Sequence, residues 1–230
     1  MQAAAEFAIP IARWSSWPRT ASAEEKAPDV GFVDASMRRR LSPLAKKMLH
    51  VAHECAGGDA ALQGKLRLVF ASQHGELSYT VSLLRSLAAR EPLSPNAFSL
   101  SVHNGAAGLF SILRGDRSES TALAAGDETL GAALAEARCQ LDADPERPVL
   151  VVYADSAFPG EYRDFAEGAH GDRALAVLLK AGAARTATIE LGSAQGGPRS
   201  ETAQPEAFLA HLADGAPGTW HGAQRTWSWH

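Results

Sequence analysis

Apolar and polar positions divide the chain into short apolar runs and longer segments of helical spacing. The nearly continuous apolar run at 148–154 is typical of a strand that is covered on both faces. Shorter runs rich in apolar and β-branched residues predict further strands, at 7–13, 65–71, 120–125, 174–179 and 187–191.

Helices are predicted where apolar residues recur three and four positions apart. Such spacing places four side chains on one face of a helix that follows the strand at 120–125, namely Leu130, Leu134, Ala137 and Leu141. The same spacing predicts helices at 36–55, 77–89, 103–113 and, more briefly, 207–212.

The order of these elements favours an α/β fold, in which a mainly parallel sheet carries crossover helices on its faces. Composition changes near residue 195, so we assign 1–195 to one domain and 196–230 to a C-terminal extension. The tail of this extension contains Trp220, Trp227 and Trp229. These side chains are expected to pack on the chain's own sheet or against another subunit, because tryptophan is enriched at interfaces.

Composition excludes several function classes. The chain has 230 residues, of which 46% are hydrophobic and 21% charged, and its formal net charge of −4 argues against a nucleic-acid binder. No apolar run is long enough for a transmembrane helix, and the N-terminus lacks the pattern of a signal peptide. Two cysteines argue against a disulfide framework, so we expect a cytoplasmic protein.

The turn between the strand at 120–125 and the following helix has the layout of a nucleophile site. A helix N-terminus at such a turn lowers the pKa of a thiol. Here, however, the turn contains Gly126, Asp127 and Glu128, and the two carboxylates would oppose a thiolate. Asp127 is expected to cap the helix. The turn is interpreted as a vacated nucleophile site, and the alternative is an ordinary strand-to-helix loop.

The sequence around this turn resembles the N-terminal half of a β-ketoacyl synthase, a member of the thiolase superfamily. It is most similar to the short ketosynthase-like chain-length factors of aryl polyene pathways. The resemblance implies one half of the thiolase-like fold, with a mainly parallel five-stranded sheet and crossover helices on both faces. The segments that carry it are 93–95, 98–112 and 121–134, with weaker matches at 32–34, 38–42 and 70–76.

The resemblance also implies what the chain lacks. In the alignment the ketosynthase cysteine falls at Gly126, where polyketide chain-length factors typically have glutamine. The two histidines of the ketosynthase C-terminal half have no counterpart, since no HGTGT-like or NxxxGH-like segment occurs. The expected function is therefore a non-catalytic subunit, without catalytic residue or cofactor. It would form a heterodimer with an active β-ketoacyl synthase, stabilise it and shape its acyl pocket.

Candidate contacts follow from the same resemblance. In thiolase-fold dimers the strand before the nucleophile pairs with its counterpart across the two-fold axis. This implies a partner interface with six residues, Ser120, Ala122 and Leu123 on the strand and His103, Asn104 and Phe110 nearby. An acyl carrier protein is a further possible partner for a basic cluster, formed by Arg38, Arg39, Arg40, Lys46 and Lys47. A solvated helix face is the alternative interpretation of that cluster.

Two other functions stay open. A free-standing acyltransferase or thioesterase would use Cys139 or Thr129, and a homodimeric acyl-binding module would need no partner enzyme. We expect no metal site at His50, His53 and Cys55, because the last two diverge around a helix and no second ligand cluster completes a site.

Overall fold

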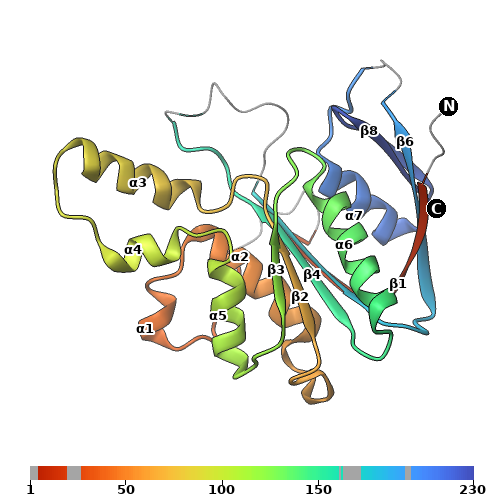
Figure 1. Ribbon diagram of the computed structural model, residues 1–230, viewed down its shortest axis with the longest axis horizontal. Helices are drawn as coiled ribbons and strands as arrows, with labels where there is room; N and C mark the ends of the chain where they lie inside the picture. Colours follow the sequence, from red (N-terminus) through yellow and green to blue (C-terminus); the bar gives the residue numbers. More distant parts are fainter. Residues whose placement is uncertain (1–4, 20–26, 161, 163–171, 195–197) are drawn as a thin grey trace.

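The computed structural model describes residues 5–19, 27–160, 162, 172–194 and 198–230. Eight strands form one sheet in the order β3-β2-β4-β5-β1-β6-β8-β7 (Figure 1). Their bounds are β1 Ala5–Trp17, β2 Arg67–Ala71, β3 Ser120–Leu123, β4 Val149–Asp155, β5 Arg173–Leu179, β6 Arg185–Ser193, β7 Gly218–His221 and β8 Arg225–Trp229.

The α-helices of the described residues are α1 Ala35–Arg38, α2 Pro43–Ala52, α3 Leu77–Ala88, α4 Pro95–Leu100, α5 Gly105–Arg114, α6 Thr129–Ala143 and α7 Gln204–Asp214. A π-helical turn at His53–Gly57 extends α2, and a short 3-10 turn follows at Ala60–Leu62. None of these helices combines the length and apolar composition that crossing a bilayer requires.

The α/β class is confirmed, but the sheet differs from the mainly parallel, five-stranded one expected. Only the pairs β2–β3 and β2–β4 are parallel, and the other neighbouring strands of the described sheet run antiparallel. The long strand β1 lies between β5 and β6 and pairs with both. Local patterning identifies strands but not their partners, so neither this insertion nor the addition of β7 and β8 was evident.

Helices cover both faces of the sheet, as expected. Along β4 every residue is buried, and successive side chains enter opposite layers. Leu150 and Val152 pack in the core beneath α2 and α5, whereas Val149 and Val151 pack in the core beneath α6 and α7. The apolar face predicted for α6 is buried in that second core.

The helix predicted at 36–55 is broken in the structure. Proline starts α2 at Pro43, where its fixed φ suits the first helical turn, and the Ser42 hydroxyl accepts a hydrogen bond from the Ala45 amide at 2.8 Å. The capping pair therefore starts a new helix after α1, rather than continuing one long helix.

The C-terminal residues belong to the same sheet. Trp220, Trp227 and Trp229 are all buried in the core shared with α6 and α7, which confirms packing on the chain's own sheet. The fit depends on Gly131 of α6, because a Cβ there would lie 2.6 Å from the Trp227 ring. The tryptophans of β7 and β8 thus close the α6 side of the molecule.

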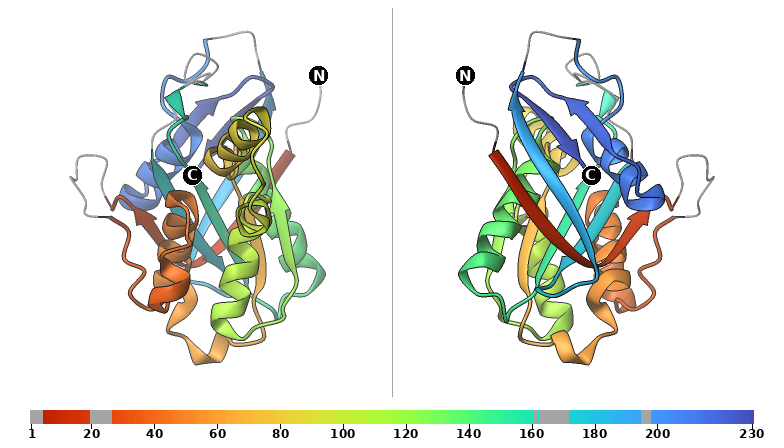
Figure 2. Two further views of the ribbon diagram at one scale, coloured as in Figure 1. Left: turned by 90° about the vertical axis from the view of Figure 1, so that its left-hand side faces the viewer. Right: turned by 90° about the vertical axis from the view of Figure 1, so that its right-hand side faces the viewer.

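Helices α3 and α4 stand apart from this body. They extend from one end of the sheet, beside α5 (Figures 1 and 2). Only Val81 of α3 is buried, and no residue of α4 is. Helix α4 was not predicted from the sequence. We call α3, α4 and the residues between them, 77–100, the helical arm.

Candidate functional site

The turn after β3 contains no side chain that could act as a free nucleophile. Gly126 has φ +60°, a left-handed conformation that favours glycine. The buried Thr129 hydroxyl donates to the Gly126 carbonyl at 2.6 Å and accepts from the Ala125 amide at 2.9 Å. The hydroxyl proton of Thr129 is therefore held in a hydrogen bond that closes the turn.

The expectation that Asp127 caps α6 is wrong. The N-cap residue is Glu128, and no side chain caps the helix there. Asp127 instead accepts a 3.3 Å hydrogen bond from the Ala223 amide. The two acids of the turn are thus directed to the C-terminal hairpin β7–β8 rather than to the first turn of the helix.

Glu128 is the main link between the turn and that hairpin. This buried carboxylate accepts hydrogen bonds from the amides of Gln224 and Arg225, at 3.1 and 2.9 Å. It also accepts from the Arg225 guanidinium at 3.3 Å and from the Trp227 indole at 3.1 Å. Four donors satisfy the buried charge, which would otherwise be costly. No local sequence signal indicates this role, because the partners of Glu128 lie 96–99 residues away.

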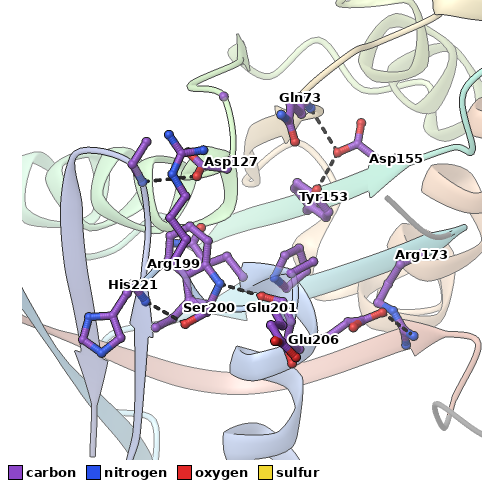
Figure 3. Close-up of a pocket in the computed structure, with 17 residues that line it drawn as sticks. Gln73, Asp127, Tyr153, Asp155, Arg173, Arg199, Ser200, Glu201, Glu206 and His221 are labelled. Carbon is purple, nitrogen blue, oxygen red and sulfur yellow. Dashed lines mark hydrogen bonds and ion pairs between the residues drawn. The ribbon is translucent and has the colours of Figure 1, made fainter. Parts of the chain in front are cut away.

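A cavity of about 320 Å³, within the size range of small-molecule pockets, lies beside the turn. It opens at the carboxyl ends of β2, β3 and β4, and residues 199–206 and the hairpin form its other wall (Figure 3). The lining residues are Gln73, Gly126, Asp127, Tyr153, Asp155, Arg173, Arg199, Ser200, Glu201, Thr202, Ala203, Gln204, Pro205, Glu206, Trp220, His221 and Ala223.

The buried acid in this cavity is already saturated with donors. Asp155 accepts from the Ser72 hydroxyl at 2.7 Å and from the amides of Gln73 and His74 at 3.2 and 3.3 Å. It also accepts from the Tyr153 hydroxyl. Burial, together with the Asp155 charge, raises the pKa of Tyr153 well above its ordinary value, so the phenol stays protonated. Neither group is poised as a general base.

The other polar groups are paired in ways that do not make a catalytic dyad. Arg173 donates to Glu206 at 2.9 Å. The Ser200 hydroxyl accepts from the backbone amide of His221, not from its ring, whose Nδ1 lies 3.2 Å from the Thr226 hydroxyl (Figure 3). The Ser200–His221 contact is therefore a link between backbone segments.

Five of the six candidate interface residues are exposed or half-buried, and one is buried. Ser120 and Ala122 are exposed on β3, an edge strand, and Leu123 is half-buried beside them. His103 and Asn104 are exposed before α5, and His103 Nε2 lies 2.9 Å from the Ser72 carbonyl oxygen. Phe110, in contrast, is 1% exposed and packs in the chain's own core. Phe110 cannot contact a partner without unfolding α5, so it does not belong to the surface.

One of the five residues of the basic cluster is not at the surface. Lys47 is buried, and its ammonium donates to the Ser156 hydroxyl at 2.8 Å and to Asp172 at 2.5 Å. Helical spacing turns it inward, while Lys46 beside it stays partly exposed. Among the residues described, no three His, Cys, Asp or Glu side chains form a group suited to a metal ion. His53 instead stacks on Phe32, with ring centroids 3.8 Å apart.

Neither suggested alternative nucleophile faces the cavity. Cys139 is exposed on α6 and does not line the cavity, and Thr129 is held in the turn. Cys55 is buried, and burial raises the pKa of its thiol to about 12. It is therefore a protonated core residue at neutral pH.

The model of the β-ketoacyl synthase N-terminal domain matches residues 12–230. A solved structure from Xenorhabdus doucetiae, a ketosynthase (ApeO) in complex with its chain length factor (ApeC), matches with a TM-score of 0.81 and 24% identity. The match covers 97% of this chain and 99% of that one. No curated protein sequence matches the chain.

Two longer chains also match. The ishigamide ketosynthase/chain length factor matches with a TM-score of 0.59 and 18% identity, over 82% of this chain and 68% of that one. A β-ketoacyl synthase from Burkholderia phymatum STM815 matches with a TM-score of 0.59 and 13% identity, over 82% and 57%. These likenesses show a thiolase-like ketosynthase fold.

Proposed function

Because the chain belongs to the family of β-ketoacyl synthase N-terminal domains, we propose that it is a non-catalytic chain-length factor. It forms a heterodimer with an active β-ketoacyl synthase in aryl polyene or a related fatty-acid-like biosynthesis, stabilises that enzyme and shapes its acyl pocket. One observation carries the proposal: glycine occupies the turn where a condensing enzyme needs its thiolate.

The surroundings of Gly126 support a non-catalytic role. Thr129 is fixed in the turn, and the Tyr153–Asp155 pair is buried and saturated. The Glu128 carboxylate lies at the N-terminus of α6, where a thiolate would otherwise be stabilised. Acyl transfer through this turn thus lacks both a nucleophile and a base.

The open edge of the sheet supports pairing with another subunit. The Glu119 carbonyl accepts from an amide of β2, and the Leu123 carbonyl accepts from the amide of Ser72, directly after β2. The alternate residues Ser120 and Ala122 therefore direct their backbone groups away from the sheet. Unpaired edge groups of this kind bind a strand of another chain readily. A ketosynthase subunit offers such a strand in the thiolase-fold dimer that the resemblance implies.

Exposed apolar side chains flank this edge. The helical arm exposes Leu84, Leu87, Leu93 and Phe98, and the neighbouring α5 region exposes Val102 and Ile112. Figure 2 shows the arm above α5, with β3 alongside. Exposed apolar side chains that gather into a patch mark interaction sites on soluble domains, and six in one helical region favour such a site here. The similar structure from Xenorhabdus doucetiae, a ketosynthase in complex with its chain length factor, favours a ketosynthase as the occupant.

Co-expression with an active β-ketoacyl synthase of the same organism tests the proposal. We expect a one-to-one complex by size-exclusion chromatography with light scattering, and condensing activity that disappears when this chain is omitted. Ala122→Pro removes an outward N–H and is expected to abolish the complex, while Ala122→Ser keeps the N–H and serves as the matched control. No complex with wild type, or acyl transfer by this chain alone that Cys139→Ala removes, would favour a free-standing enzyme instead.

We also propose an acyl carrier protein as a second partner. Its docking would rest on Arg38, Arg39, Arg40 and Lys46, since Lys47 is buried. A lone homodimer with bound acyl chain would instead identify the acyl-binding module.

A further inference from the structure

The described sheet has an open edge within it as well as at its ends. Strand β5 pairs with residues 11–17 of β1, whereas β6 pairs with residues 5–11. The first part of β1, residues 5–10, therefore has a neighbouring strand of the described sheet on one side alone (Figure 2). A groove of about 380 Å³, lined by Ala8, Pro10 and Arg138 among others, leaves room for a strand to approach on the open side.

The hydrogen bonds of β6 show which residues of β1 face this open side. Thr188 exchanges backbone hydrogen bonds with His230, directly after β8, at 2.8 and 3.1 Å. The even-numbered residues of β6 thus bond toward β8 and its odd-numbered residues toward β1. Their register partners in β1 are odd-numbered as well. Glu6 and Ala8 therefore direct their backbone groups away from β6, to the open side.

Arg138 of α6 lies across this edge. Its Nη1 donates to the Ala8 carbonyl at 2.6 Å, in the position that the amide of an added strand would take. Its Nε and Nη2 donate to the Asp142 carboxylate, at 2.9 and 2.5 Å, and these bonds orient the guanidinium. A charged side chain at an open edge is one of the ways in which proteins prevent the addition of a strand.

The edge strand β7 is covered in a similar way, and β3 is not. Both backbone groups of His221 bind Ser200. The His221 amide donates to the Ser200 hydroxyl at 2.9 Å, and the Ser200 amide donates to the His221 carbonyl at 3.0 Å. Among the described residues, by contrast, no hydrogen bond reaches the outward backbone groups of Ser120 and Ala122 on β3.

A second copy of this chain fits the open edge of β1. When two copies pair antiparallel about Phe7, Glu6 of each lies opposite Ala8 of the other, and the two residues exchange both backbone hydrogen bonds. This register also keeps the two Glu6 carboxylates from lying directly opposite each other, which would be destabilising. Pro10 limits the edge, because its carbonyl already accepts from the Lys180 amide at 3.1 Å. The edge is therefore short and complementary to itself.

We propose that Arg138 prevents a second copy of this chain from adding to β1, and so leaves β3 as the edge that stays open to another chain. The guanidinium occupies the Ala8 carbonyl, and its removal exposes an edge with which the chain itself can pair. The proposal concerns this chain alone and holds whether or not a ketosynthase is the protein that binds β3. It gives Arg138 a function in excluding a wrong partner.

Sedimentation velocity of the purified full-length chain, over a wide range of concentrations, tests the proposal. All variants carry Ala122→Pro, which removes an outward amide of β3 and so separates the result from any pairing at that edge. Arg138→Ala is expected to lower the dissociation constant for self-association at least about tenfold. Arg39→Ala, at an exposed arginine directly after α1, is the matched control and should leave that constant unchanged.

Further substitutions identify the edge that is responsible. Ala8→Pro removes the outward amide and should return the Arg138→Ala variant to the dissociation constant of the Ala122→Pro background. Ala8→Ser keeps the amide and should not. Hydrogen exchange gives an independent measure, because in Arg138→Ala the Ala8 amide should become protected as the concentration rises. The amide of Phe7, which faces β6, should be protected at every concentration.

A second variant covers the case in which Arg138→Ala fails to fold. Asp142→Ala leaves Arg138 in place but removes the bonds that orient its guanidinium. It should also increase self-association, to a smaller extent than Arg138→Ala. No increase in either variant, or an increase that Ala8→Pro leaves unchanged, would overturn the proposal.

Discussion

Large apolar side chains are buried in the C-terminal hairpin and exposed in the helical arm. In β7 and β8 the three tryptophans are buried, and polar groups of the turn after β3 hold the hairpin in place. In the arm and the adjoining α5 region, six large apolar side chains are exposed. The hairpin therefore completes the core of this chain, whereas the arm has apolar surface that the other described residues leave exposed. Under the proposed function, intrachain stability and partner binding would depend on separate regions.

Truncation of the central hairpin tryptophan is the most severe test of this difference. Trp227→Ala should lower the free energy of unfolding by about 3–5 kcal/mol, because it removes a large ring from the closely packed contact with Gly131. Urea unfolding of the isolated chain measures the loss. The matched arm variant Phe98→Ala, at a residue that is 64% exposed, should change stability by less than about 0.5 kcal/mol. Equal losses of unfolding free energy in the two variants would contradict the view that the hairpin, and not the arm, stabilises the fold.

The Glu128 link is expected to contribute the next largest effect. Glu128→Gln removes the charge that four donors share, and should destabilise the chain by about 2 kcal/mol. Asp127→Asn is the control, since Asp127 makes a single 3.3 Å contact with the hairpin and should cost far less. Hydrogen exchange of the β8 amides would show whether the hairpin is the part that loosens. Unchanged protection in Glu128→Gln would mean that the tryptophans alone hold it.

Substitutions in the arm should weaken partner binding and leave the stability of the isolated chain to denaturant nearly unchanged. Phe98→Asp places a charge in the exposed apolar surface and is expected to weaken ketosynthase binding by at least about tenfold, equivalent to about 1.4 kcal/mol. Thr219→Asp, on the exposed side of the opposite edge strand β7, is the control. Biolayer interferometry with immobilised ketosynthase measures both variants. A complex that tolerates Phe98→Asp but not Ala122→Pro would confine the interface to β3.

Local patterning predicted the parts of the molecule whose neighbours are local. The buried face of α6 and the fully buried β4 follow from the spacing of apolar residues. The start of α2 was missed, although Ser42 and Pro43 form a recognisable cap and first-turn pair. Attention to that pair would have divided the long helix.

Contacts between residues that lie far apart in the chain could not be predicted from the sequence. Glu128 resembles any acid near a helix start, and its donors on the hairpin lie almost 100 residues later. The Gln204–Gly131 bond spans 73 residues, and the insertion of β1 between β5 and β6 depends on the whole sheet. Because the cavity is assembled from such contacts, only the position of Gly126 could be inferred in advance.

The smallest expected effect concerns Glu76, at the base of the arm. Burial raises the pKa of this carboxyl, although its hydrogen bond from Ser42 and the nearby Lys47 charge act in the opposite direction. The folded chain therefore binds this proton more tightly than the unfolded chain does. Stability should fall as the pH rises from the unfolded pKa through the higher folded pKa.

Glu76→Gln keeps the acceptor for Ser42 and removes the titration. The variant should be slightly more stable than wild type at neutral pH, and its urea midpoint should decline less between about pH 4 and pH 8. Glu91→Gln, at an exposed residue just beyond α3, should leave the wild-type profile unchanged. If the Glu76→Gln profile still followed that of wild type, the pH dependence would arise outside the arm. The attachment of the arm would then not depend on the protonation of Glu76, and polar contacts such as the 2.8 Å hydrogen bond from the Tyr79 hydroxyl to the Arg40 carbonyl would hold it at every pH.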